Sequence, residues 1–162
     1  MELWDLYDAN RTVIGEHVRG KELPADSYHL VVHVWIKNSR GQYLISQRAQ
    51  SRPTVPLMWE CVGGSVLKGE SSLQGALRET QEEVGLRLPP ESGKLLFSKI
   101  RKSFHDIVDV WLFTYDGTVS LEHATTDEVE QTIWIDRAGI LKLKEEEKLV
   151  HTLDYFFEKV DL

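Results

Sequence analysis

The sequence predicts an α/β fold in which a mixed β-sheet is sandwiched by helices. Several short runs rich in β-branched and aromatic residues are separated by turn residues, which is the pattern of strands. A helical pattern in the middle of the chain and another at its end supply the helices. No low-complexity linker or internal repeat interrupts the sequence, so residues 1–162 are interpreted as one domain large enough to bury a core.

The first part of the chain is expected to form a β-hairpin. Residues 2–7 and 12–17 alternate in the manner of short strands, and the polar residues 8–11 between them suit a turn. The segment of N-terminal strands is assigned to residues 1–27, ahead of the main sheet.

The main sheet is expected to begin with residues 29–36, a run rich in valine and aromatic residues. Residues 42–48 follow a turn and are interpreted as the hairpin partner of that run. Further strands are expected at residues 58–63, 95–101, 106–114 and 132–135. Residues 145–160 carry apolar side chains on one stripe, which predicts an amphipathic helix that closes the chain.

The central helix carries signals for both of its ends. Ser71 and Gln74 have the spacing of a capping box at the start. Gly85 stands where a left-handed C-terminal cap is favoured. Between these ends lies a stripe expected to face the core, composed of Leu73, Ala76, Leu77, Thr80 and Val84.

The other side of this helix is acidic. Glu79, Glu82 and Glu83 are three and four residues apart, or adjacent, so their side chains project from one side of the helix. Like charges at this spacing repel each other unless a cation lies on that face. Clusters of carboxylate oxygens suit hard divalent cations, so the sequence predicts a site for Mg²⁺ or Mn²⁺.

The spacing of residues 64–86 resembles the signature of the Nudix hydrolases, G-x5-E-x7-R-E-x-x-E-E-x-G. Thr80 departs mildly from it, because an aliphatic residue is commoner at that position. The resemblance covers about residues 28–160 and implies an α/β/α sandwich with a mixed sheet. It also implies a metal-dependent hydrolase that cleaves the pyrophosphate bond of a nucleoside diphosphate derivative. The seven fixed positions are occupied by Gly64, Glu70, Arg78, Glu79, Glu82, Glu83 and Gly85.

The same resemblance implies a role for each charged residue of this motif. Glu79 and Glu83 are expected to be metal ligands, and Glu82 is expected to be a third ligand or the base that acts on the attacking water. Gly63 could offer its backbone carbonyl to the metal. Arg78 is expected to orient the carboxylates through charge-assisted hydrogen bonds.

Carboxylates outside the helix are also candidates. Many Nudix enzymes place a further catalytic glutamate on a distant loop, and Glu128 has the best position for it here, ahead of Asp127 and Glu130. Glu60 is a weaker candidate on the strand before the motif. Glu70 is expected to help from the periphery.

A second resemblance concerns residues 28–48, which are similar to the branch of the superfamily related to isopentenyl diphosphate isomerase. Those isomerases carry a catalytic cysteine and then a metal-binding histidine just after the tryptophan that Trp59 matches. Here Cys61 stands two positions too early, and no histidine follows. Gly63 and Gly64, the pair typical of the hydrolases, are present instead. The hydrolase interpretation is therefore favoured, with Cys61 as a small buried strand residue.

Several other side chains have both a functional and a structural interpretation. His29 and His33 share one face of a strand, where they could bind a transition metal or contact substrate, or else be one interior and one surface histidine. Arg48 and Arg52 flank the approach to the motif and could meet substrate phosphates. Aromatic side chains that could stack on a base, but are more often part of a core, are Trp35, Trp59 and Phe104.

Composition narrows the partners and the location. A net charge of −7 argues against a nucleic-acid polymer as partner, because phosphate contacts need a basic surface. No run approaches the ~20 apolar residues of a membrane span, so no membrane partner is expected. Cys61 is the only cysteine and the first residues lack the apolar run of a signal peptide, so a cytoplasmic location is expected.

Two questions stay open at this level. The chain could be a non-catalytic Nudix-like module that binds a nucleotide or metabolite, although such a module has no chemical need for every acidic residue of the motif. The N-terminal strands could also pair with a second copy, so that a homodimer is one open interpretation.

Overall fold

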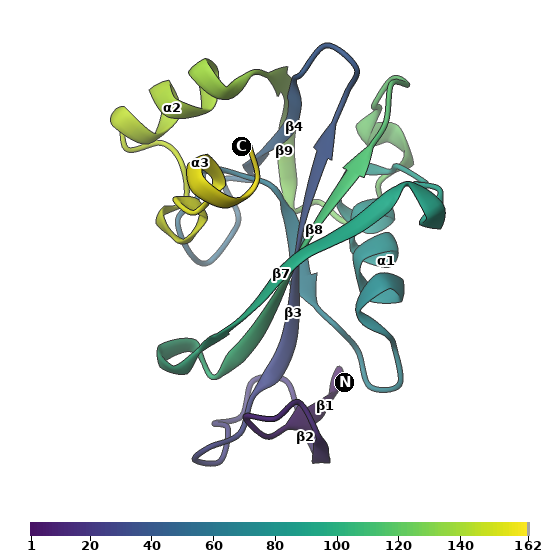
Figure 1. Ribbon diagram of the computed structural model, residues 1–162, viewed down its shortest axis with the longest axis vertical. Helices are drawn as coiled ribbons and strands as arrows, with labels where there is room; N and C mark the ends of the chain where they lie inside the picture. Colours follow the sequence, from purple (N-terminus) through teal and green to yellow (C-terminus); the bar gives the residue numbers. More distant parts are fainter. Residues whose placement is uncertain (162) are drawn as a thin grey trace.

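The computed structural model describes residues 1–161 and shows a mixed β-sheet between helices on its two sides (Figure 1). Helix α1 (Ser72–Val84) covers one side, and helices α2 (Arg137–Glu145) and α3 (Phe156–Lys159) cover the other. The predicted α/β sandwich is therefore confirmed. Within residues 1–161, none of the helices is long and apolar enough to span a membrane.

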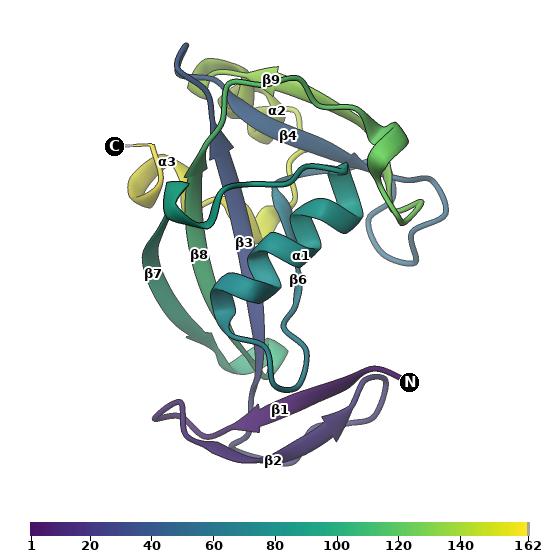
Figure 2. The ribbon, with the colours of Figure 1, turned by 90° about the vertical axis from the view of Figure 1, so that its right-hand side faces the viewer.

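The N-terminal hairpin forms a two-stranded sheet of its own. Strands β1 (Leu3–Tyr7) and β2 (Val13–Val18) pair antiparallel, as their alternating sequence predicts. Figure 2 shows this hairpin beyond one end of the main sheet, close to the loop that leads into α1. A bridge between Tyr7 and Tyr28 joins it to the rest of the chain.

The main sheet has seven strands and its centre is strand β3 (His29–Lys37). Strand β8 (Asp106–Thr114) runs parallel to β3 along its whole length, and β7 (Gly93–Arg101) pairs antiparallel with β8. The other strands are β4 (Tyr43–Arg48), β5 (Trp59–Glu60), β6 (Val62–Ser65) and β9 (Val129–Ile135). Short 3-10 turns occur at η1 (Pro90–Ser92), η2 (Lys102–Phe104), η3 (Leu121–His123) and η4 (His151–Leu153).

Strands β3 and β4 are a hairpin only at their turn. The single paired position is Lys37 with Tyr43, beyond which β4 turns away and pairs with β5 and β9. The expected strand at residues 58–63 is likewise two strands, because the chain leaves β4 after Glu60 and joins β3 from Val62 onward. The sheet thus divides into two halves at the segment that leads into α1.

The prediction of one amphipathic helix over residues 145–160 is wrong. Helix α2 ends at Glu145, and the backbone around Leu149 is extended instead. Trp59 donates its N–H to the carbonyl of Lys148 at 2.7 Å and accepts from the N–H of Val150 at 2.9 Å. Pairing with β5 therefore replaces the helical hydrogen bonds, and only the short α3 remains helical near the end.

Two hydrophobic clusters lie on opposite sides of the sheet because β3 alternates. Leu30, Val32, Val34 and Ile36 pack toward α1, whereas Trp35 packs toward α2 and α3. Both clusters contain fully buried side chains. This double burial fixes α1 on the sheet, and with it the acidic residues that α1 carries.

Candidate active site

Helix α1 begins and ends where its capping residues predict. Ser71 and Gln74 form a reciprocal capping box, in which each side-chain oxygen accepts the other residue's backbone N–H. Gly85 has a φ of 71° and ends the helix in the left-handed conformation. Ala76 and Val84 are fully buried against the sheet. The acidic side of α1 is thus presented by a capped and packed helix.

Arg78 joins three carboxylates of the motif. Its Nε and Nη2 donate to the two oxygens of Glu70 at 2.8 and 3.0 Å. Its Nη1 donates to Glu79 at 3.0 Å and to Glu82 at 3.1 Å, and Nη2 also donates to the carbonyl of Ser65 at 2.9 Å. The charge-assisted hydrogen bonds expected of this arginine are therefore present.

Two glycines of β6 allow the helix to approach the sheet closely. A Cβ atom on Gly64 would overlap the carboxyl group of Glu79. A Cβ atom on Gly63 would lie 2.8 Å from the carbonyl oxygen of Val32 on the neighbouring strand. No larger residue fits at either position without a shift, so the glycine pair is required by the contact between β6 and its neighbours.

Glu83 is a buried carboxylate with no partner. Its residue exposure is 4%, and among the described residues no donor forms a hydrogen bond or an ion pair with it. Burial raises the pKa of Glu83 well above the ordinary glutamate value, and the carboxylates of Glu60, Glu79 and Glu128 raise it further. Arg52 acts in the opposite direction. Such a group lacks a compensating cation.

Glu79 has a similar environment. Burial raises its pKa from 4.5 to about 7, and Glu82 and Glu128 add to the rise. Arg78 opposes this rise through its charge and its hydrogen bond. The structure therefore places two glutamates with raised pKa values side by side on α1, the kind of perturbation that marks functional sites more often than structural ones.

Two further glutamates lie at the same place, each bound to an arginine. Arg48 donates to Glu60 at 2.9 Å, and Arg52 donates to Glu128 at 2.7 Å. Burial raises the pKa of Glu60, and Arg48 opposes that rise. Both glutamates act on the pKa of Glu83, so the structure brings them to the acidic side of α1.

The loop that carries Glu128 is fixed directly to the end of α1. The carbonyl of Glu82 accepts the backbone N–H groups of Thr125 and Thr126 at 2.9 and 3.2 Å. The carbonyl of Glu128 in turn accepts the N–H of Ala49 at 2.9 Å. Figure 2 shows these segments together beside the C-terminal end of α1. Nothing in the sequence pattern indicates these loop contacts, because they join residues far apart in the chain.

The donor set suits a hard divalent cation, although it is not yet arranged around one. Within residues 1–161, no three His, Cys, Asp or Glu side chains already form a metal site. Glu79 and Glu82 are hydrogen-bonded to Arg78, so a cation beside Glu83 would compete with this arginine for Glu79. The unpartnered Glu83 and the all-oxygen chemistry of its neighbours fit Mg²⁺ or Mn²⁺.

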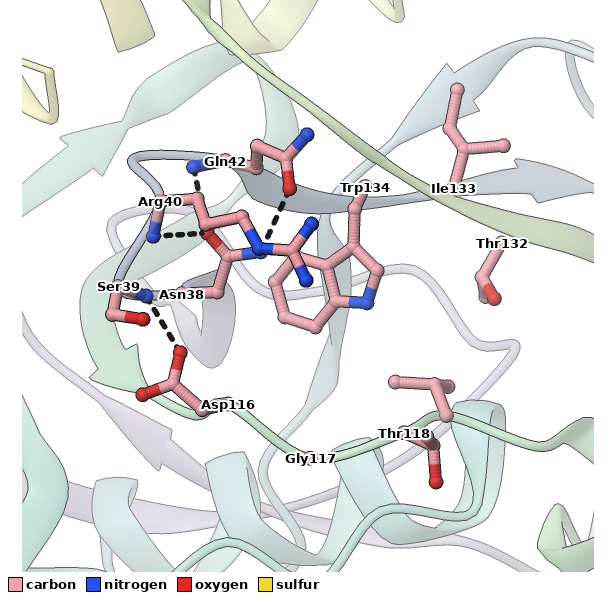
Figure 3. Close-up of a pocket in the computed structure, with 11 residues that line it drawn as sticks. Asn38, Ser39, Arg40, Gln42, Asp116, Gly117, Thr118, Thr132, Ile133 and Trp134 are labelled. Atoms are coloured by element: carbon pink, nitrogen blue, oxygen red, sulfur yellow. Dashed lines mark hydrogen bonds between the residues drawn. The ribbon is translucent and has the colours of Figure 1, made fainter.

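Cavity size does not identify this site. A cavity of about 460 Å³ includes Arg19, Arg52 and Glu128 in its lining, but none of the glutamates of α1. A larger cavity, of about 820 Å³, lies elsewhere, between the β3–β4 turn, the segment after β8, and β9 (Figure 3). Trp134 and Arg40 line it, and none of the acidic residues of the motif does. The chemistry of the side chains is therefore the better guide.

The two histidines of β3 pack against aromatic side chains, although the buried Nδ1 atom of His29 has no hydrogen-bond partner among residues 1–161. The ring of His29 stacks on Trp4 with centroids 4.0 Å apart, and burial lowers its pKa to about 4. The Nδ1 atom of His33 lies 2.7 Å from the Tyr155 hydroxyl, and burial lowers the pKa of His33 to about 3. The expectation of one surface histidine is not met, since both rings are packed against other side chains.

The remaining candidates are mostly structural. Cys61 is buried, and burial raises its pKa well above the usual thiol value. Trp35 and Trp59 belong to the cluster beneath α2 and α3. Phe104 is 53% exposed, and the guanidinium of Arg101 lies 4.5 Å from its ring centre.

Comparison with known proteins places this geometry in a family context. The family model described as NUDIX domain matches residues 27–156. An uncharacterized Nudix hydrolase of Listeria monocytogenes is 35% identical over 97% of this chain and 91% of its own length. An isopentenyl-diphosphate Delta-isomerase of Escherichia coli is 31% identical over 70% of this chain and 65% of its own. A crystal structure from Deinococcus radiodurans matches with a TM-score of 0.74 at 23% identity, covering 92% of both chains.

Proposed function

Because this chain belongs to the NUDIX domain family, we propose that it hydrolyses the pyrophosphate bond of a nucleoside diphosphate derivative with the help of Mg²⁺ or Mn²⁺. The observation that carries this proposal is Glu83, a buried carboxylate without a cationic partner at the centre of other carboxylates. Burying an unpaired charge is costly, so a fold retains such a group where a ligand completes it.

Glu79 and Glu83 are the proposed metal ligands, with Glu82 as a third ligand and the carbonyl of Gly63 as a fourth donor. When bound, the cation neutralises diphosphate oxygens and lowers the pKa of a bound water. Arg78 keeps Glu79 and Glu82 in place through its hydrogen bonds. Because Arg78 also binds Glu70, the carboxylate of Glu70 prevents the arginine from moving toward the metal.

The water that attacks phosphorus needs a proton acceptor, and two residues compete for that role. Glu82 lies at the rim of the acidic group, with 37% of its side chain exposed. Glu128 borders the cavity of about 460 Å³, with 44% of its side chain exposed and Arg52 beside it. Glu128 can accept a proton from a water bound at this cavity, and Glu82 can accept one from a water on the acidic side of α1. The pH dependence of the rate distinguishes the two candidates. Substitution of the residue that acts as the base removes one limb of this pH profile, whereas substitution of the other leaves both limbs.

The charges around the cavity support a phosphate-bearing substrate. Arg19 and Arg52 line it together with Glu128, so guanidinium groups stand next to the proposed catalytic carboxylate of that loop. A metal on one side and arginines on the other suit the two phosphates of a diphosphate. The overall charge of −7 supports a small molecule rather than a nucleic-acid polymer.

Similarity to the isomerase favours one alternative, the isomerisation of an allylic diphosphate. Cys61 is the only thiol in the chain, but it is buried in the core, where an allylic substrate does not reach it. The hydrolase therefore remains the better proposal. The single cysteine also leaves no intrachain disulfide, which supports a cytoplasmic location as part of the proposal.

The test is a panel of nucleoside diphosphates linked to sugars, amines, coenzymes or further phosphates, incubated with protein and Mg²⁺. Release of a nucleoside monophosphate from at least one compound is the expected result, and Glu83→Gln is the matched inactive control. If the wild-type protein binds a compound from the panel but cleaves none, the chain is a binding module. Sedimentation of the same sample tests whether the chain forms a homodimer, the interpretation that the sequence left open.

A further inference from the structure

The N-terminal hairpin, β1 and β2, lies outside the residues that match the family model, yet it contacts the loop that leads into α1. In this loop, residues 65–70, the N–H of Lys68 donates to the carbonyl of Leu3 at 2.8 Å. The N–H of Gly69 donates to the carboxylate of Asp5 at 2.9 Å. The side chain of Lys68 also forms an ion pair with Glu16 of β2. Both strands of the hairpin therefore bind one loop.

This loop determines where Glu70 lies. Gly69 has a φ of 82°, so the backbone reverses directly before Glu70. The side chain of Glu70 accepts the N–H of Leu67 at 2.8 Å, which closes the loop on itself. The same carboxylate holds Arg78 by two hydrogen bonds, and Arg78 reaches Glu79. These hydrogen bonds, together with the peptide bond between Gly69 and Glu70, connect Asp5 to a proposed metal ligand.

The hairpin is itself anchored to the core beside the start of α1. Arg11, in the turn of the hairpin, forms two hydrogen bonds with the fully buried Asp109 of β8. On the same strand, the indole N–H of Trp111 donates to the hydroxyl of Ser72, the first residue of α1, at 2.9 Å. The hairpin consequently bonds to the loop through Asp5 and, through Arg11, to the strand that contacts the helix start. Two separate anchors fix its position relative to the motif.

We propose that Asp5 is a positioning residue of the active site, which holds the loop at Gly69 so that Glu70 can fix Arg78 beside Glu79. The inference rests on the proposed hydrolase function. Without the Asp5 acceptor, the loop gains freedom, Glu70 loses its fixed place, and Arg78 is free to change its hydrogen bonds to Glu79. Asp5 itself stays on the hairpin and contacts no reacting atom.

The test compares Asp5→Ala, which removes the acceptor, with Asp5→Asn, which keeps an acceptor oxygen. The matched control is Glu22→Ala, which removes an exposed carboxylate from the same N-terminal segment and makes no hydrogen bond or ion pair among the described residues. Hydrogen exchange of the Gly69 amide and of the Arg78 Nε–H is measured by NMR, and kcat and KM are measured with the best substrate of the panel.

For Asp5→Ala, exchange at Gly69 and at the Arg78 Nε–H should accelerate by about tenfold, the scale of one lost hydrogen bond. The value of kcat should fall by about tenfold, with KM changed by less than about twofold. For Asp5→Asn, the exchange rates and kcat should lie within about threefold of the wild-type values. For Glu22→Ala, the same quantities should equal those of the wild type. Should Asp5→Ala not fold, Glu16→Gln loosens the same loop and should lower kcat by about twofold to threefold.

Faster exchange at Gly69 with unchanged exchange at Arg78 and unchanged kcat would overturn the proposal, because the loop would then be free without consequence for the site. Unchanged exchange at Gly69 in Asp5→Ala would overturn it as well. If the wild-type protein cleaves no compound of the panel, the proposed function fails alone, since the two exchange rates still decide whether Asp5 positions Arg78.

Discussion

Two carboxylates of this protein are buried to nearly the same degree and have opposite environments. Asp109 of β8 has an exposure of 0% and accepts hydrogen bonds from Arg11 and Ser98. Glu83 of α1 has an exposure of 4% and no donor among the described residues. The hydrogen bonds to Asp109 lower its pKa despite its burial, whereas burial and like charges raise the pKa of Glu83.

The difference teaches that burial alone does not assign a role to a charged side chain. The partners of Asp109 lie within the chain, so its charge is compensated by folding and it joins the N-terminal hairpin to the sheet. Glu83 has no donor among residues 1–161, and the proposed function assigns the role of its partner to a bound cation. The first carboxylate should therefore matter for stability and the second for activity.

The largest expected effect comes from removing the divalent cation that we propose as the partner of Glu83. Excess EDTA should abolish hydrolysis, because the carboxylate group then has no cation to polarise phosphate or water. Added Mg²⁺ or Mn²⁺ should restore the rate, and the unfolding of the chelated protein should stay cooperative. Undiminished turnover in excess EDTA would show that the acidic group is not a metal site.

Substitution of a single carboxylate of α1 should change activity without lowering stability. Glu83→Gln or Glu79→Gln keeps the side-chain size and should lower kcat by about 10²-fold or more, the scale of losing a principal electrostatic contact. For Glu83→Gln, the free energy of unfolding of the metal-free protein should be unchanged or higher, because a buried carboxyl group without a donor is removed. Near-normal rates in both folded variants would place the active site elsewhere.

The ion pair between Arg11 and Asp109, which anchors the hairpin, should matter for stability rather than for activity. Arg11→Ala leaves Asp109 buried without its main donor and should lower the free energy of unfolding by about 2–3 kcal/mol, a value reduced from that of a fully buried pair because 39% of the Arg11 side chain is exposed. Denaturant titration measures this. The double variant with Asp109→Asn should recover part of the loss, and equal losses in the single and double variants would contradict the comparison.

The dependence of stability on pH should have opposite signs in the two regions. Folding raises the pKa of Glu79 from 4.5 to about 7, so its contribution is complete below about pH 4.5 and is lost as the pH rises through 7, by at most about 3 kcal/mol. Folding lowers the pKa of Asp109 from 3.8, so its contribution is complete above about pH 4 and is lost as the pH falls through the folded value.

Denaturant titrations of metal-free protein from pH 3 to pH 8 check both signs. Glu79→Gln should flatten the decline between about pH 4.5 and pH 7 and leave the acid limb unchanged. A decline that persists unaltered in this variant would mean that Glu79 does not titrate in that range.

The sequence was informative wherever the signal is local. Ser71, Gln74 and Gly85 cap the helix by contacts within a few residues, and the spacing of Glu79 and Glu83 follows from the helical repeat. The strands were recognisable because β-branched residues and turns alternate along the chain. The proposed roles of the motif residues in catalysis remain predictions, since they depend on a metal and a substrate.

Contacts between segments far apart in the chain could not be predicted, because no local sequence pattern marks them. The extended backbone around Leu149 results from pairing with Trp59, which overrides the amphipathic repeat of residues 145–160. Likewise, Thr125 and Thr126 fix the Glu128 loop to α1 through backbone groups, which any residue except proline could supply. The bond between Asp5 and Gly69 spans 64 positions, so the role of the hairpin emerged only from the structure.

The smallest expected effect concerns Cys61, a third buried titratable group beside the same carboxylates. Burial raises the pKa of its thiol, with further rises from Glu60 and Glu83. Because the thiol is buried inside a packed strand, an alkene substrate cannot reach it as a general acid. Cys61→Ser should therefore leave diphosphate hydrolysis within about threefold of the wild type, because it exchanges one small buried side chain for another. Conversion of isopentenyl diphosphate to dimethylallyl diphosphate, followed by NMR and lost in Cys61→Ser, would instead make this residue catalytic and the chain an isomerase.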